Sequence, residues 1–214
     1  MQPTDHSVVQ LVSLVLDVSD SMGKAANPKH RPPIEDLRDT LACFHSDLLA
    51  IRDCLVEVSI VSFAGETQIE CAFEAVSSLT LPRLVLRKTG TNLGGALHQA
   101  LDELLARREY LRSTGMEVQQ PFLVCITDGQ PNANTAPGFE ERLVNMINKR
   151  SLIFLPLALG GSESYDALEA ISPREKPVRI GPDDAAKQTF RAFFKWISQS
   201  IDAGELLDRT SLEA

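Results

Sequence analysis

The sequence lacks the features that mark several classes of protein. No apolar run approaches the roughly 20 residues of a membrane-spanning helix, so we expect no membrane segment. Residues 1–6 have neither a basic start nor an apolar core, so we expect no signal peptide. A nucleic-acid-binding protein is also not expected, because the net charge is −8 and such proteins need a basic face.

Cysteine is scarce too. The four cysteines, Cys43, Cys54, Cys71 and Cys125, are widely scattered, and none of their spacings is that of a metal site or a redox motif. Scattered cysteines in apolar segments are typical of small buried side chains in a reducing compartment. We therefore expect a cytoplasmic protein.

What the sequence does contain is an alternation of strand-like and helix-like apolar segments. Dense apolar runs predict strands at 8–16, 55–63, 121–127 and 152–159, with a weak strand at 178–180. Helical stripes lie at 34–52, 93–105, 139–147, 165–171 and 183–201, and Pro137-Gly138 and Asp183 are expected to start two of these helices. This order predicts an α/β fold with a single doubly wound, mainly parallel sheet and helices on both faces. One domain would cover residues 8–202, between an N-terminal arm at 1–7 and a C-terminal tail at 203–214.

Two details of the sheet follow from the chemistry of turns and of proline. Residues 64–66 form a link too short for parallel pairing, so the next strand, which carries Ile69 and Cys71, should be an antiparallel edge. Pro156 removes a hydrogen-bond donor from its strand, which argues for a bulge or a sheet edge at that position.

The most informative stretch is the end of the first strand, Asp17-Val18-Ser19-Asp20-Ser21. A charge at the end of a buried strand needs a partner or water. The spacing Asp-x-Ser-x-Ser puts three oxygen donors, Asp17, Ser19 and Ser21, on one side of a tight loop. Such a donor set suits Mg²⁺ or Mn²⁺ better than Zn²⁺.

Two other polar segments are expected near the same edge of the sheet. Asp128 follows the strand at 121–127, and Thr91 lies just before the helix at 93–105. Ligands of such sheets bind beyond the carboxyl ends of the strands, so we expect the three segments to meet there. Each segment also has a plainer interpretation. Asp and Ser are common in turns, Thr91 would serve as a helix cap, and Asp128-Gly129 is a turn signal.

Together the three segments resemble the metal-ion-dependent adhesion site of von Willebrand factor type A domains. The resemblance is carried by Asp17-x-Ser19-x-Ser21, Gly90-Thr91-Asn92-Leu93-Gly94 and Thr127-Asp128-Gly129-x-Pro131. Their order, and the strands and helices between them, also match that family over residues 8–202. The compact form without a signal peptide is most similar to bacterial cytoplasmic members such as the TerY-like tellurite-resistance proteins.

This resemblance implies a metal-dependent protein-binding module rather than an enzyme. Ser19, Ser21 and Thr91 would be the direct ligands of Mg²⁺, with Mn²⁺ or Ca²⁺ as alternatives, and Asp17 and Asp128 would hold the metal mostly through waters. The open coordination position would take a carboxylate from a partner protein. The TerY-like resemblance suggests a kinase or phosphatase as that partner.

One position departs from the family pattern. The family usually has a small residue, most often glycine, where this chain has Asp20. The carboxylate of Asp20 has three interpretations: it supports the metal through water, it favours Ca²⁺ or Mn²⁺, or it points to solvent.

The loop that follows the first motif is basic, although the chain is acidic overall. Lys24, Lys29 and Arg31 lie within eight residues, with His30 beside them. We interpret them as partner-binding residues that attract an acidic group and speed its encounter with the metal. The alternative is a solvated loop whose lysines keep the protein soluble.

The alternative function is a metal-dependent phosphatase, or another hydrolase, with Asp17 as nucleophile. Aspartyl phosphatases of that kind need an acid two residues after the nucleophile, and this chain has Ser19 there. A phosphate-binding loop is not expected, because Gly23-Lys24 lacks the upstream glycine of that motif.

Overall fold

The computed structural model describes residues 8–25, 29–88, 90–129, 139–160, 162–171, 176–181 and 186–208. These residues form a seven-stranded sheet in the order β3-β2-β1-β5-β6-β7, with β4 paired to the start of β1. The strands are β1 (Val8–Asp17), β2 (Leu55–Phe63), β3 (Thr67–Ala75), β4 (Glu117–Val118), β5 (Phe122–Thr127), β6 (Ile153–Leu159) and β7 (Val178–Ile180). All described pairs are parallel except β2–β3, so the predicted fold class is confirmed.

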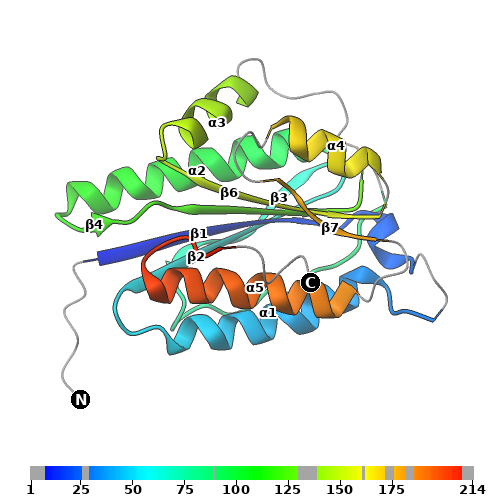
Figure 1. Ribbon diagram of the computed structural model, residues 1–214, viewed down its shortest axis with the longest axis horizontal. Helices are drawn as coiled ribbons and strands as arrows, with labels where there is room; N and C mark the ends of the chain where they lie inside the picture. Colours follow the sequence, from blue (N-terminus) through cyan, green and yellow to red (C-terminus); the bar gives the residue numbers. More distant parts are fainter. Residues whose placement is uncertain are drawn as a thin grey trace.

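Helices cover both faces of this sheet (Figure 1). They are a short 3₁₀ helix η1 (Asp20–Gly23) and the α-helices α1 (Pro33–Ala50), α2 (Leu93–Ser113), α3 (Phe139–Asn148), α4 (Ser162–Ala170) and α5 (Ala186–Ala203). Helices α1 and α5 lie on one face, and α2, α3 and α4 lie on the other. No helix in the described part of the chain has both the length and the apolarity needed to cross a bilayer.

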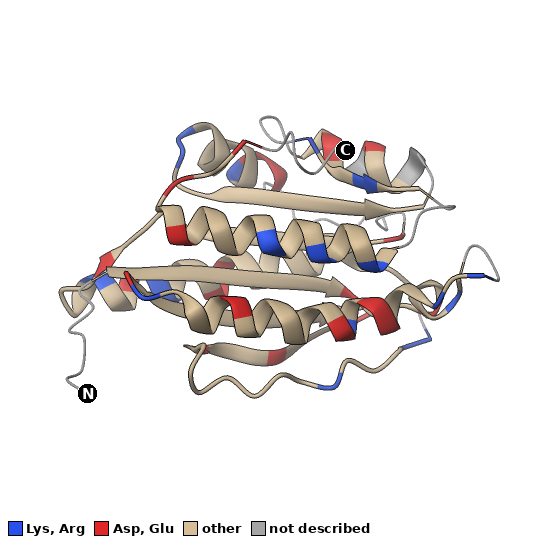
Figure 2. Cartoon of the chain, turned by 60° about the horizontal axis from the view of Figure 1, so that its bottom comes forward, with Lys and Arg blue, Asp and Glu red and all other residues tan. Residues whose placement is uncertain are grey.

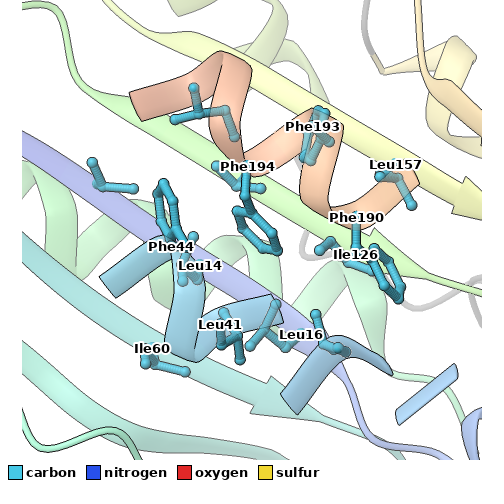
Figure 3. Packing of buried hydrophobic residues seen from close by; sticks show 14 of the residues in the cluster. Leu14, Leu16, Leu41, Phe44, Ile60, Ile126, Leu157, Phe190, Phe193 and Phe194 are labelled. Atoms are coloured by element: carbon cyan, nitrogen blue, oxygen red, sulfur yellow. The ribbon is translucent and has the colours of Figure 1, made fainter. Parts of the chain in front are cut away.

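The alternation of side chains along β1 divides the core between the two faces. Leu14 and Leu16 point towards α1 and α5, where they join an aromatic cluster in which the rings of Phe44 and Phe194 lie 4.6 Å apart (Figure 3). Val15 points the other way, into the core beneath α2. Because side chains alternate, Asp17 at the end of β1 falls on the α2 face of the sheet.

The sheet has one strand that was not expected, and it decides between the two alternatives for Pro156. The two-residue strand β4 has too few residues to give a sequence pattern, and it was not predicted. Of the two alternatives expected at Pro156, the bulge is wrong, because the β5–β6 register runs through that residue without a shift, and the sheet edge is the one that fits. Pairing between β6 and β7 begins only at Leu157. On the β7 side of Pro156 there is therefore no described strand with which its missing N–H would have to pair.

Other expectations concern the ends of elements. Helix α2 begins at Leu93 as predicted and continues beyond the predicted stripe to Ser113. The first part of the C-terminal tail packs back on the domain, since Leu206 and Leu207 contact the core and the indole of Trp196 donates to the carbonyl of Asp208 at 3.2 Å. Several predictions lie outside the described residues: the arm at 1–7, the starts at Pro137-Gly138 and Asp183, and the tail beyond 208.

Candidate metal centre

The site begins where β1 and β5 end side by side. These parallel neighbours are in register up to Leu16 and Ile126, so the next residues, Asp17 and Thr127, meet at the carboxyl edge of the sheet. The hydroxyl of Thr127 donates to Oδ2 of Asp17 at 2.6 Å and accepts the backbone N–H of Gly129 at 3.1 Å. The sequence motif contains Thr127 but assigns it no role. In the structure it connects the two strand ends.

Asp17 is completely buried and uses both of its carboxylate oxygens within the protein. Besides accepting from Thr127, it accepts the backbone N–H of Ser19 through Oδ1 at 2.8 Å. An aspartate that accepts the N–H two residues further on closes a tight turn. This turn leads into η1, which carries Ser21, and so brings both serines of the motif back over the strand end.

A chain of hydroxyl groups then joins this turn to Asp128. The Oγ atoms of Ser19 and Ser21 are 2.9 Å apart, and Ser21 donates to Oδ1 of Asp128 at 2.8 Å. Ser19 is 6% exposed, whereas Ser21 lies open to solvent. The four residues therefore form one contiguous cluster with a buried base at Asp17 and an open side at Ser21.

Thr91 reaches the same cluster from the loop before α2. A Cβ atom added to Gly129 would lie only 2.9 Å from the Thr91 hydroxyl oxygen, so Thr91 sits directly against the Asp128–Gly129 turn. The expected capping role of Thr91 is wrong, because the side chain of Asn92 caps α2 by accepting the N–H of Gly95 at 3.1 Å. The hydroxyl of Thr91 is thus not needed for the helix.

Burial of two carboxylates so close together perturbs their ionisation. Burial raises the pKa of Asp17 above its ordinary value, against the opposing effect of its hydrogen bonds from Ser19 and Thr127. Burial and the neighbouring charge of Asp17 raise the pKa of Asp128 to about 6. Both shifts mean that the ionised pair is costly in the protein alone, and a cation between the two segments would relieve that cost.

The chemistry of these donors fits a hard divalent cation. The cluster contains two carboxylates and three hydroxyls from Ser19, Ser21 and Thr91, all of them oxygen donors. The described ranges hold no group of three or more His, Cys, Asp or Glu side chains arranged for a metal ion, and this cluster, with two carboxylates, relies on hydroxyls for its other donors. Mg²⁺, Mn²⁺ and Ca²⁺ prefer oxygen ligands, and hydroxyls with few carboxylates leave room for waters.

Asp20, the residue that departs from the family pattern, lies apart from these hydrogen bonds. Its carboxylate forms an ion pair with Lys24 at 2.7 Å, and both side chains are more than half exposed. The hydrogen bond from Lys24 lowers the pKa of Asp20 below its ordinary value. Of the three interpretations of Asp20, an outward-pointing carboxylate is the one that this geometry supports.

The basic loop borders the cluster but is partly neutralised. Lys24 and Arg31, together with Asp128, line a hollow of about 160 Å³ at the carboxyl edge of the sheet. Arg31 is within 3.4 Å of three carboxylates, those of Glu35, Asp36 and Asp39. The positive charge near the hollow is therefore largely offset by the protein's own acidic residues. Lys29 is exposed and is not part of the described lining.

Three solved structures illustrate the fold similarity. The PilB minor pilin from Streptococcus sanguinis is 15% identical with a TM-score of 0.63, and the match covers 96% of this chain and 64% of that one. Proximal thread matrix protein 1 from the mussel byssus, with a zinc-occupied adhesion-site motif, is 18% identical with a TM-score of 0.61, and the match covers 88% of this chain and 46% of that one. VWA2, the ArnB paralog from Sulfolobus acidocaldarius, is 13% identical with a TM-score of 0.55, and the match covers 89% of this chain and 45% of that one. At these identities the likeness concerns the fold, and this chain spans less than two thirds of each protein.

The family assignment comes from the sequence itself. No curated protein matches the chain closely enough to serve as a relative. The pattern of the von Willebrand factor type A domain matches residues 12–191, which is most of the chain and includes every residue of the cluster. Domains of this family generally mediate protein interactions through a site that binds a divalent metal ion. The chain belongs to the von Willebrand factor type A domain family.

Proposed function

We propose that this protein is a binding module that uses Mg²⁺ to capture a carboxylate of a partner protein. The observation that carries this proposal is the hydrogen-bonded cluster of Asp17, Ser19, Ser21 and Asp128, with Thr91 packed against it. In the proposed complex the three hydroxyl oxygens are the direct ligands, and the two aspartates act mostly through water. The metal supplies a positive charge and one exchangeable coordination position.

The protein's own residues would prepare this site before any partner arrives. Asp17 is held by two hydrogen bonds, and the same bonds fix the turn that carries Ser19. Ser21 is open to solvent, so a partner can approach from that side without displacing the core. Preorganised ligands bind a metal more tightly because less order has to be imposed during binding.

The basic loop adds a secondary attraction for an acidic partner, since neighbouring carboxylates already offset much of its charge. Lys24 and Arg31 line a hollow together with Asp128, and Lys29 belongs to the same loop. These cations would guide a carboxylate towards the metal and reduce its repulsion from the protein's net negative charge. The narrower form of the proposal is a cytoplasmic stress system of the tellurite-resistance type, with a kinase or a phosphatase as partner. This narrower form rests only on the resemblance of the sequence to the TerY-like proteins.

The rival function, hydrolysis with Asp17 as nucleophile, has an unfavourable geometry. Asp17 is 0% exposed and both of its oxygens accept hydrogen bonds, so neither is free to attack a phosphoryl group. Phosphatase and ATPase assays with Mg²⁺ and Mn²⁺ test this point. Turnover that disappears in Asp17→Asn would overturn the binding-module proposal.

A pull-down with a matched pair of variants tests the proposal directly. Wild type and Asp20→Ala should retain the same partner proteins in Mg²⁺, because Asp20 pairs with Lys24 outside the cluster. Asp128→Ala should lose these partners, and EDTA should release them from wild type and Asp20→Ala. Partners that stay bound to wild type in EDTA would contradict a metal-dependent module.

A further inference from the structure

The connector between β3 and α2, residues 76–92, ends in a segment that is attached to the residues just after β1 and just after β2. The backbone N–H of Arg87 donates to the carbonyl of Val18 at 2.8 Å, and the backbone of Arg87 pairs with that of Ser19 in an isolated parallel β-bridge. Further on, the N–H of Asn92 donates to the carbonyl of Ala64 at 2.6 Å. Thr91 therefore lies in a short stretch whose two ends are each attached to the carboxyl edge of the sheet.

The side chain of Arg87 strengthens the first of these attachments. Its guanidinium is half-buried and donates to the hydroxyl of Ser62 on β2 and to the side-chain oxygen of Gln68 on β3, the latter at 3.3 Å. Both Ser62 and Gln68 in turn donate to the carboxylate of Glu70. The charge of Arg87 is thus balanced by Glu70 through two intervening neutral groups.

The Nε–H group of Arg87 takes no part in holding the guanidinium. Nε of Arg87 is buried and has no acceptor among the described residues, so the hold rests on the two terminal nitrogens. Ser62 is completely buried, which fixes the acceptor on the sheet side. A lysine has a single nitrogen in place of this planar fork and cannot hold both acceptors in the same way.

We propose that Arg87 is a positioning residue for the metal site: its guanidinium, bound to Ser62 and Gln68, fixes the connector so that Thr91 is held against Asp128 and Gly129. This role rests on the proposed metal site. Residues 88–90 lie between Arg87 and Thr91, and Gly90, at a φ of 60°, provides little stiffness of its own, so the attachment on either side sets where the hydroxyl lies. Residues that orient metal ligands typically change metal affinity by about 10- to 100-fold when they are replaced.

The expected effect is a loss of metal affinity that depends on Thr91. Arg87→Met should weaken the binding of Mn²⁺ and Mg²⁺ about tenfold, measured by calorimetry well below the melting temperature of each variant. In a Thr91→Ala background the same change should cost less than about threefold, because there is no hydroxyl left to position. Arg87→Lys should recover part of the affinity, because its ammonium can still reach one of the two acceptors.

A second arginine on the same connector provides a matched control. Arg38, on α1, donates through Nε to the carbonyl of Leu84 at 3.0 Å, so it also holds the connector, which runs past α1 (Figure 2). Arg38→Met should lower thermal stability but leave the metal dissociation constant within about twofold of wild type. If Arg87→Met fails to fold, Ser62→Ala removes only one hydroxyl and tests the same attachment.

The outcomes separate the positioning role from the site itself. Equal losses from Arg87→Met in the wild-type and Thr91→Ala backgrounds would overturn the positioning role, as would an equal loss from Arg38→Met. Metal binding that Thr91→Ala weakens but that neither Arg87→Met nor Ser62→Ala affects would also overturn it, while leaving the proposed function intact. A wild-type protein that binds neither cation would remove the metal site and this role together.

Discussion

Ser21 and Asp128 are 107 residues apart in the chain and are joined by a hydrogen bond of 2.8 Å. This bond connects the turn after β1 with the turn after β5, on the open side of the cluster. On the buried side, Asp17 and Thr127 make the equivalent connection between the strand ends. A cation bound here would contact segments that only the folded chain brings together, so it should bind the folded protein and not the unfolded chain.

The first prediction concerns thermal stability. Mg²⁺ or Mn²⁺ at about 100 times its dissociation constant should stabilise the fold by roughly 2.7 kcal/mol, because only the folded chain has the site. For a domain of this size that corresponds to a rise of about 5–10 °C in melting temperature, measured by differential scanning calorimetry. Asp17→Ala and Asp128→Ala should abolish the rise.

Asp20→Ala is the matched control for this experiment, since it also removes one carboxylate from the same edge of the sheet. Its partner is Lys24, so the metal-dependent rise should persist. An unchanged rise in both Asp17→Ala and Asp128→Ala would rule out the proposed ligand set. A rise that disappears in Asp20→Ala would give that residue a place at the metal.

The second prediction concerns pH. The folded state raises the pKa of Asp128 from 3.8 to about 6, so it binds this proton more tightly than the unfolded chain does. The stabilising contribution is complete below about pH 4 and is lost as the pH rises through about 6. At about 1.4 kcal/mol per pKa unit it amounts to at most roughly 3 kcal/mol. In metal-free buffer, the unfolding free energy of wild type minus that of Asp128→Asn should fall over this range.

Metal affinity should show the opposite trend. A proton has to leave Asp128 before the cation binds, so affinity should weaken about tenfold from pH 7 to pH 5. Taking the difference from Asp128→Asn removes the contribution of the other titratable groups, which the two proteins share. An identical pH profile in wild type and Asp128→Asn would show that Asp128 does not exchange a proton for the metal.

The third prediction tests whether the hydroxyl group at position 91 is a metal ligand. Because Asn92 caps α2, Thr91→Ala should cost well under the roughly 1 kcal/mol of a lost helix cap. Its effect on metal and partner binding should be far larger, whereas Thr91→Ser should retain most of the affinity. Calorimetric titration of the three proteins with Mn²⁺ makes the comparison. If Thr91→Ser binds as weakly as Thr91→Ala, the hydroxyl is not a ligand.

The fourth prediction concerns the basic loop. Lys24→Glu combined with Lys29→Glu should slow association with an acidic partner and flatten its salt dependence, with little change in dissociation. The effect will be moderated by the acidic residues that already surround Arg31. Lys149→Glu with Lys195→Glu changes the net charge equally at positions outside this loop, and it should slow association less. Equal association rates in all three proteins would make this a solvated loop without a role in encounter.

The sequence predicted those site residues that lie where a buried apolar run gives way to polar residues. Asp17 and Asp128 stand at such boundaries, and parallel strands bring their carboxyl ends to one edge, so their meeting could be predicted. The role of Thr127 could not, because a threonine at the end of a strand has no distinctive spacing. The links from Arg87 to Ser62 and Gln68 depend on the path of an irregular connector, and no periodicity describes that path.

The same distinction applies to the fold. Long apolar strands and helices were located from their periodicity, whereas β4 consists of two residues that pair with Val8 and Val9. The packing of residues 204–208 also gave no sequence signal. Leu206 and Leu207 stand between Glu205 and Asp208 without any periodic pattern, and their partial burial comes from contact with the core. Short segments of this kind are ordered by tertiary contacts rather than by their own propensity.

The position of β1 between β2 and β5 has a consequence for kinetics. Asp17 and Thr127 are separated by 110 residues, so their contact closes a long loop and should form late in folding. A cation that needs both strand ends would then find no site in the folding transition state. It would slow unfolding and leave the folding rate nearly unchanged. The metal would therefore set how long each folded molecule survives, and a chelator would shorten that lifetime.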